Sequence, residues 1–163
     1  MGQGAIGDRI YYIDPVLPQH EGVIGQMEFS GAKLALFLGR DLLVIRRDDK
    51  PDIPYPGHWD LPGGGREGAE SPVDCALRET WEEVGLRVVP SDLTWSNSYQ
   101  RPRGTVWFFA AHLPDGVQEK IRFGDEGQGW RLMSPQAYCA HPMAVPHFTE
   151  QLHLYMRKSP RFP

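Results

Sequence analysis

The stretch "GGGREGAESPVDCALRETWEEVGL", residues 63–86, constrains the fold more than any other part of this 163-residue chain. Ser71–Asp74 has the features of a helix start: a serine cap, a proline at the first helical position and an acid three residues after the cap. Gly85 is typical of a helix end. The sequence therefore predicts a glycine-rich loop that leads into one helix.

This helix has two distinct faces. At 100° per residue, one face collects Val73, Ala76, Leu77, Thr80 and Val84, and another collects Glu79, Glu82 and Glu83. Like charges at positions i, i+3 and i+4 repel each other and weaken a helix. A divalent cation reverses that penalty, and Mg²⁺ or Mn²⁺ prefers carboxylates together with waters and phosphate oxygens. Taken alone, a glutamate-rich face is more often simply solvated.

Length and composition indicate a globular protein. We expect one domain over residues 1–163, with 1–30 as an N-terminal extension, and the hydrophobic and charged fractions of 40% and 23% argue against disorder. The net charge of −4 gives no basic field for DNA, RNA or an anionic membrane. The chain has neither a membrane-length apolar run nor a secretory leader, and Cys75 and Cys139 form no disulfide framework, so we expect a cytoplasmic protein.

The remaining pattern is rich in strands. "KLALFLGRDLLVIRR" predicts a hairpin of strands 33–38 and 42–46, followed by a proline-rich loop at 48–59. Further strands are expected at 92–100, 104–113 and 129–134, and helices at 134–140 and 146–157. This order of elements predicts an α+β fold, with helices on the flanks of a sheet.

The segment 64–86 resembles the signature of the Nudix hydrolase family, position by position. All the fixed residues of that signature are present: Gly64, Glu70, Arg78, Glu79, Glu82, Glu83 and Gly85. Thr80 is the one departure, because the family pattern prefers an aliphatic residue there. "LLVIRR" and "WDLPGGG" also agree with the family. The resemblance implies a mixed β-sheet sandwiched between helices (α/β/α).

The resemblance also implies an activity, namely Mg²⁺-dependent cleavage of a nucleoside diphosphate linked to a group X, with Mn²⁺ as the alternative ion. It assigns metal binding to the glutamates of the helix and to one main-chain carbonyl: Glu79, Glu82, Glu83 and the carbonyl of Gly63. Glu83 and Arg78 are expected in catalysis, with Arg78 pairing with one of the glutamates. Gly64 and Glu70 are expected to support the loop and the helix.

Other candidates lie outside the signature. The resemblance also implies a carboxylate from a distant loop that acts as a general base or further metal ligand. The run Glu-Gly-Gln in "FGDEGQGW" resembles that loop in mutator-type relatives, so we favour Glu126 over Asp125, with a loop acid that faces water as the alternative. The resemblance implies a phosphate-binding arginine at the end of the hairpin, and we favour Arg47 over Arg46, with a solvated strand end as the alternative. Only one of the two can face the site, because adjacent strand residues point to opposite faces. Arg101 and Arg103 are weaker candidates. The aromatic candidates for holding a base are Tyr55, Trp59, Trp107 and Phe109. Each could instead be an ordinary core or loop aromatic, and we favour core packing for at least one of the last two.

The substrate and the partners stay open at this stage. The stretch "MAVPHFTEQL" lacks the asparagine with which mutator-type relatives read oxidised guanine, which argues against that base. A nucleoside triphosphate, ADP-ribose or a nucleotide sugar would each fit, and a nucleotide-binding regulator without catalysis is the alternative of another class. The intact glutamates favour an enzyme. The strand-like "RIYYID" could form the arm of a homodimer.

Overall fold

The computed structural model describes residues 28–162, so the dimer arm and nearly all of the expected N-terminal extension lie outside the described residues. The strands are β1 (Gly31–Leu38), β2 (Asp41–Arg46), β3 (Trp59–Asp60), β4 (Gly63–Gly65), β5 (Leu93–Arg101), β6 (Gly104–Leu113) and β7 (Gly129–Met133). The helices are α2 (Pro72–Val84), α3 (Pro135–Ala140) and α4 (Pro146–Lys158), with short 3₁₀ turns η3 (Pro90–Asp92) and η4 (Val117–Lys120). The hairpin, the later strands and all three helices are confirmed within a few residues.

The seven strands form one mixed sheet. β1 lies at its centre and pairs with β6 in parallel over its whole length, and β5 pairs with β6 on the outer side in antiparallel orientation. On the other side of β1, β2 pairs with β1, β3 and β7, in each case antiparallel. The mixed sheet that the family resemblance implies is therefore present.

β1 and β2 diverge soon after their turn. They pair only at Phe37–Leu42 and Leu38–Asp41. Farther from the turn, β4 takes the place of β2 beside β1, where Gly31, Ala32 and Lys33 pair with the three glycines of β4. The segment 59–65 therefore fills the gap between the two diverging strands, and it carries the glycine-rich loop to the start of α2.

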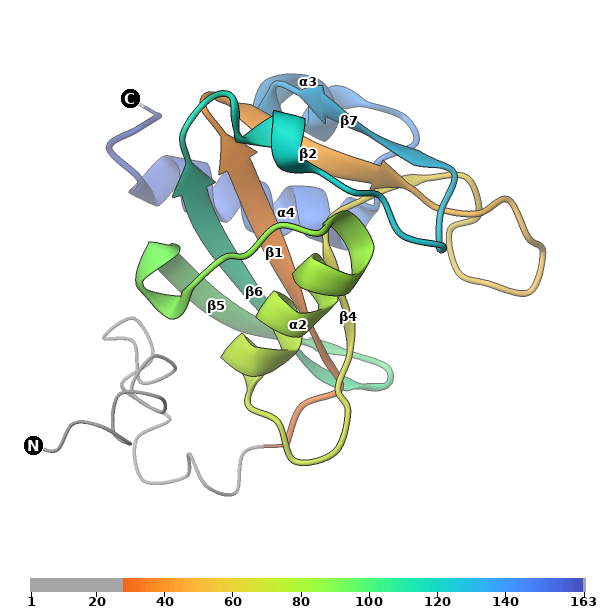
Figure 1. The fold of residues 1–163 in the computed structure, drawn as a ribbon. Coiled ribbons are helices and arrows are strands. Elements are labelled where there is room, and N and C mark those ends of the chain that lie inside the picture. The colour runs from red at the N-terminus through yellow and green to blue at the C-terminus, as the bar shows by residue number, and fades with distance from the viewer. Residues whose placement is uncertain (1–27, 163) are drawn as a thin grey trace, which may run out of the picture.

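The sheet is covered by a helix on each face, as Figure 1 shows for α2 in front and α4 behind. Strand residues alternate between the two sides. Leu34 and Leu36 of β1 pack in the core under α2, whereas Ala35 and Phe37 pack in the core under α4. The α/β/α arrangement is thus confirmed. No helix of the described residues is long and apolar enough to cross a membrane.

Helix α2 has the ends that its sequence predicts. The Ser71 hydroxyl accepts a hydrogen bond from the Asp74 amide at 3.1 Å, and Gly85 ends the helix with φ 68° in the left-handed region. Thr80, the departure from the family pattern, is fully buried, and its hydroxyl donates to the Ala76 carbonyl at 2.8 Å. This internal hydrogen bond satisfies the hydroxyl and lets threonine occupy an apolar position.

Candidate active site

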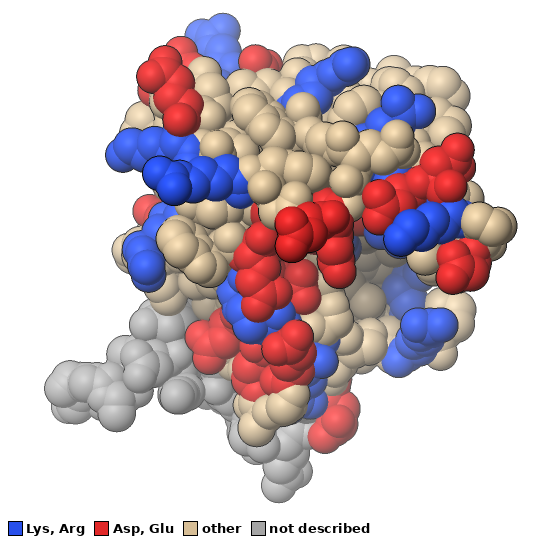
Figure 2. All heavy atoms as spheres, turned by 45° about the vertical axis from the view of Figure 1, so that its right-hand side comes forward, with Lys and Arg blue, Asp and Glu red and all other residues tan. Residues whose placement is uncertain are grey.

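Arg78 organises the acidic face of α2. Its Nη1 lies 3.1 Å from both Glu79 Oε2 and Glu82 Oε1. Its Nε and Nη2 contact the two oxygens of Glu70 at 3.0 and 2.9 Å, and Nη2 also donates to the Gly65 carbonyl at 2.9 Å. Arg78 therefore orients two of the acids and fastens the glycine loop to the helix. Figure 2 shows a band of acidic side chains with basic ones among them on one face of the molecule.

Glu70 has the surroundings of a supporting residue. Burial alone would raise its pKa, but the hydrogen bonds from Arg78 and from the Glu67 amide, at 2.8 Å, hold the pKa of Glu70 below its ordinary value. Both of its oxygens are engaged in these contacts. Glu70 thus links the start of the loop to the middle of α2.

Glu83 lies deeper than the other two acids of the cluster. Its Oε1 accepts a hydrogen bond from the Gly63 amide at 2.9 Å. Burial raises the pKa of Glu83 to about 7, while the nearby Lys33 and the Gly63 amide act in the opposite direction. Burial also raises the pKa of Glu79. Two carboxyl groups are therefore held where their ionised forms need a compensating positive charge.

The glycines of the loop allow this close approach. Gly63 has φ 131°, and a Cβ there would collide with the Ala32 carbonyl and the Lys33 backbone. At Gly64, a Cβ would lie 2.7 Å from the carboxyl carbon of Glu79. Glycine is therefore required at the first position by backbone conformation and at the second by the acid that packs against it.

The donor set suits a hard cation, because three glutamates and the Gly63 carbonyl supply only oxygen. Within residues 28–162, however, no three His, Cys, Asp or Glu side chains are grouped so that they could hold a metal ion. One oxygen of each glutamate is already engaged, since Arg78 contacts Glu79 Oε2 and Glu82 Oε1 and the Gly63 amide donates to Glu83 Oε1. Lys33 Nζ also donates to the Gly63 carbonyl at 2.9 Å. The oxygen donors are of the type that a hard cation prefers, and the role of these residues as metal ligands stays a prediction.

A bridge of three charged residues, centred on a buried aspartate, spans the gap between the diverging strands. Asp60 is only 6% exposed, and its two oxygens accept from Lys33 Nζ at 3.0 Å and from Arg47 Nη1 at 2.7 Å. Lys33 Nζ also donates to the carbonyls of Leu61 and Gly63 at 3.1 and 2.9 Å. The bridge thus connects β1, β3 and the end of β2 beside the predicted metal ligands, and it leaves one net positive charge.

A cleft of about 450 Å³ opens beside this bridge. Its lining includes the bridge itself, two arginines, a histidine and several apolar or aromatic residues: Lys33, Arg47, Asp60, Arg101, Arg103, Tyr55, Val106, Val145, His147 and Phe148. His147 accepts or donates a hydrogen bond with the Tyr99 hydroxyl through Nδ1 at 2.8 Å. Burial, with Arg101 and Lys33 nearby, lowers the pKa of His147 to about 4, so this ring is neutral at pH 7.

A second cavity of about 280 Å³ lies on the other side of the bridge and shares Arg47 and Asp60 with the cleft. We call it the acidic cavity; its lining is Ile45, Arg47, Asp48, Lys50, Ile53, Asp60, Glu83, Glu126 and Gly127. It brings Glu83 of α2 together with Glu126 from the loop before β7. Asp125 is exposed and does not line it. This placement favours Glu126 over its neighbour.

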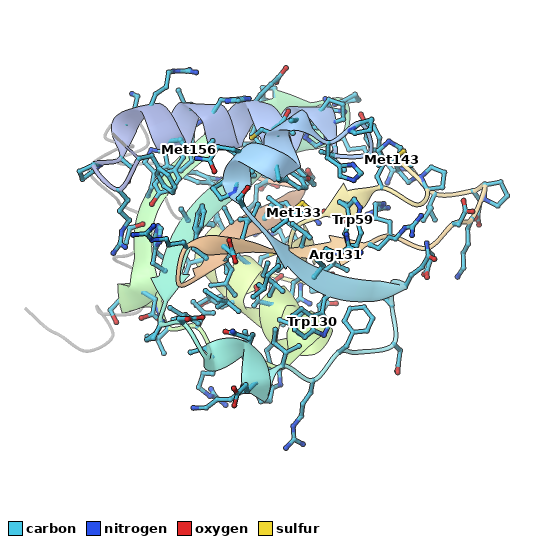
Figure 3. The ribbon with its side chains drawn as sticks, turned by 90° about the horizontal axis from the view of Figure 1, so that it is seen from above. Trp59, Trp130, Arg131, Met133, Met143 and Met156 are labelled. Carbon is cyan, nitrogen blue, oxygen red and sulfur yellow. The ribbon has the colours of Figure 1, made fainter. Side chains whose placement is uncertain are left out.

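The predicted substrate-binding residues separate in the structure. Arg47 and Tyr55 line the cleft, whereas Arg46 is exposed and donates from Nε to the Gly57 carbonyl at 3.3 Å. Trp59 does not line the cleft. It packs in the core under α4, with the Arg131 guanidinium 4.9 Å from its ring centre, and Figure 3 shows Trp59 and Arg131 side by side.

The two candidates on β6 belong to the core. Trp107 and Phe109 are 0% and 1% exposed, pack in the core under α2, and stack on each other with ring centres 6.1 Å apart. Core packing, the alternative reading of these aromatics, is therefore what the structure shows for both. Neither ring lines the cleft or the acidic cavity.

Sequence reasoning missed Lys33, Asp60 and His147. The first two did leave a signal, because each is a charged residue within an otherwise apolar strand segment, "KLALFL" and "WDL". Charged residues at buried strand positions are rare unless they pair, so the two could have been matched to each other. His147 left no such signal, because its place depends on how α4 packs against β5.

Comparison with known proteins identifies the family. The model of the NUDIX domain matches residues 30–155. A MutT-like protein from Streptomyces ambofaciens is 47% identical over 91 residues, which cover 55% of this chain and 53% of that protein. The NAD-capped RNA hydrolase NudC from Chromobacterium violaceum is 31% identical over 136 residues, which cover 80% of this chain and 49% of NudC. The chain thus spans about half the length of these two relatives.

A solved structure agrees with the fold. The MutT protein from Methanosarcina mazei Go1 superimposes with a TM-score of 0.65 at 21% identity, over 80% of this chain and 94% of that protein. The matched NUDIX model covers most of the chain, and the signature residues lie together at one site on α2 and its preceding loop. The chain belongs to the Nudix hydrolase family, as its signature predicts.

Proposed function

We propose that this protein is a Mg²⁺-dependent pyrophosphohydrolase that cleaves a nucleoside diphosphate linked to a group X and releases a nucleoside monophosphate. One observation carries the proposal. Glu83 and Glu126, 43 positions apart in the sequence, face one cavity together with Arg47, and that cavity adjoins a cleft large enough for a nucleoside. Acids and a cation around one small volume match the needs of phosphoryl transfer.

The residues divide the chemistry between them. Glu79, Glu82, Glu83 and the Gly63 carbonyl would hold the divalent cation, with Mn²⁺ as the alternative ion. When bound, such a cation neutralises the diphosphate and makes a water more acidic. Arg47 binds a phosphate oxygen, and the Asp60 carboxylate holds its guanidinium in place. Glu126 accepts a proton from the attacking water or adds an oxygen donor.

The identity of X is the less constrained part of the proposal. The relatives include a NAD-capped RNA hydrolase and an RNA pyrophosphohydrolase, and these names differ in substrate. The panel that tests the proposal therefore holds canonical and modified triphosphates, ADP-ribose, nucleotide sugars, dinucleoside polyphosphates, NAD⁺ and a 5′-triphosphate RNA. We further propose a single domain that works in the cytoplasm.

The test is phosphate release from this panel with Mg²⁺, coupled to an added phosphatase. We expect a strong signal from one substrate class that disappears with EDTA and returns with excess Mg²⁺. Activity that survives EDTA would contradict the metal assignment. A folded protein that is silent across the panel would contradict the proposal and favour a nucleotide-binding regulator.

A further inference from the structure

We propose that the cleft receives a part of the substrate that carries a phosphate monoester of its own, beyond the diphosphate that is cleaved. This inference rests on the proposed function, because it assumes that the diphosphate lies between the cleft and the acidic cavity. It names the chemical class of the group that occupies the cleft, which the family signature does not specify.

The first argument is the charge of the cleft. Among residues 28–162, four cationic side chains line it, and Asp60 is the one carboxylate that does. Both oxygens of Asp60 are already used by Lys33 and Arg47. Asp60 therefore cannot compensate Arg101 and Arg103, and these two positive charges remain in a protein whose net charge is −4.

The second argument is that neither arginine has an acidic partner in the part of the chain that the structure describes. Among the described residues, Arg101 and Arg103 take part in no ion pair or hydrogen bond through their side chains, whereas Arg47 and Arg78 do. Two unpaired guanidinium groups two positions apart provide several N–H donors for one anion. A phosphate monoester carries a charge of about −1.5 to −2 at pH 7, which two arginines match better than one phosphodiester charge.

The third argument is that the backbone of the turn that carries this pair is held in place. Arg101 ends β5, and the turn to β6 consists of Pro102 and Arg103. Proline restricts the backbone of the turn. Thr105, the second residue of β6, accepts hydrogen bonds at its carbonyl from the amide and the hydroxyl of Ser30, at 2.8 and 3.2 Å. The turn is thus fastened to the entry of the central strand beside the cleft.

The fourth argument is the space between the two cationic regions. Tyr55, His147 and Phe148 form an aromatic wall of the cleft, with the ring centres of Tyr55 and His147 6.0 Å apart. His147 is neutral at pH 7, so it adds no further positive charge to this wall. A sugar or base can therefore lie on the wall while its phosphates lie near Arg47 on one side and the arginine pair on the other.

The experiment measures binding without catalysis. Isothermal titration calorimetry compares adenosine 2′,5′-bisphosphate with AMP, and guanosine 3′,5′-bisphosphate with GMP, in the absence of metal. None of these ligands contains an anhydride, so the result does not depend on hydrolysis. We expect at least one bisphosphate to bind about tenfold or more tightly than its monophosphate, as charge-assisted hydrogen bonds predict.

Variants test whether the preference for a bisphosphate depends on the two arginines. The double variant Arg101→Gln/Arg103→Gln should lose the preference for the bisphosphate and keep its affinity for the monophosphate. The matched control is Arg40→Gln in the β1–β2 turn, which removes an exposed arginine that lines neither cavity and should keep the preference. A preference that survives in the double variant, or disappears equally in the control, would overturn the proposal.

Two further outcomes are decisive. If the wild-type protein binds neither bisphosphate more tightly than its monophosphate, or binds none of the four ligands, the inference is wrong even where the hydrolysis panel succeeds. If the dinucleotide pApA, which offers a phosphodiester, binds more tightly than both bisphosphates, the assignment of a monoester is overturned. Silence in the hydrolysis panel with a clear bisphosphate preference would instead reject the catalytic function alone.

Discussion

The two cavities on either side of the Lys33–Asp60–Arg47 bridge differ in charge although they share two of its residues. Counted over the described residues 28–162, the acidic cavity has four carboxylates and two cations in its lining, whereas the cleft has one carboxylate and four cations. A substrate that spans both must present a cation-compensated diphosphate to one and an anionic or neutral group to the other. The bridge is therefore the boundary between an acidic cavity and a cationic cleft.

The largest effect is expected from the acidic side. Glu83→Gln should lower kcat by a factor of about 10² or more, because it removes a carboxylate charge and keeps an oxygen that can accept from the Gly63 amide. Steady-state kinetics with Mg²⁺ measures this effect, and thermal unfolding checks the fold. The matched control is Glu119→Gln, an exposed acid on η4 outside both cavities. Wild-type turnover in Glu83→Gln would sink the site assignment.

A substitution at Asp60 tests the contribution of the bridge to stability. Asp60→Asn should destabilise the protein by about 2 kcal/mol, because it leaves two cations facing each other across the strand gap. We expect less than the loss for a fully buried pair, since the Lys33 and Arg47 side chains are 14% and 27% exposed. Urea unfolding gives the value. A variant as stable as the wild type would mean that the bridge contributes nothing to holding β1 and β2 apart.

A smaller effect is expected across the acidic cavity. Glu126→Gln should lower kcat roughly tenfold, less than Glu83→Gln, because Glu126 is exposed and held by fewer contacts. Asp125→Gln beside it is the control, since Asp125 does not line the cavity. Equal rates for the wild type and Glu126→Gln would reduce Glu126 to a loop acid that faces water.

The smallest effect concerns the cleft and appears only with pH. The pKa of His147 is lowered to about 4 in the folded protein, below the ordinary value of about 6.5. The unfolded chain therefore takes up a proton first as pH falls, and stability is lost between about pH 6.5 and 4. His147→Gln should reduce this loss by under about 1 kcal/mol, given the partial exposure of the ring. Urea unfolding at pH 7 and pH 5 tests it, and an unchanged difference between the two pH values would contradict it.

The sequence predicted those parts of the fold that depend on local signals. α2 was predictable because its cap, its glycine end and its acidic face all lie within one segment. The β1–β2 hairpin was predictable because its two apolar runs and its turn also lie within one short segment. The bridge was not, because Lys33 and Asp60 meet only through the divergence of β1 from β2, which no local pattern encodes. The aromatic candidates show the same limit, since Tyr55 and Trp59 lie in one short segment of the sequence, yet Tyr55 lines the cleft and Trp59 packs in the core.

The tight fit of Gly63 and Gly64 has a consequence for how this protein can diverge. A side chain at Gly63 would collide with the central strand, and one at Gly64 would displace Glu79. A substitution at either position would therefore disrupt the acid cluster. Substitutions that change substrate specificity must therefore occur outside these two glycines. The turn that carries Arg101 and Arg103 and the loop that carries Tyr55 lie outside this constraint, and they are where a lineage, or a directed-evolution library, can acquire a new specificity.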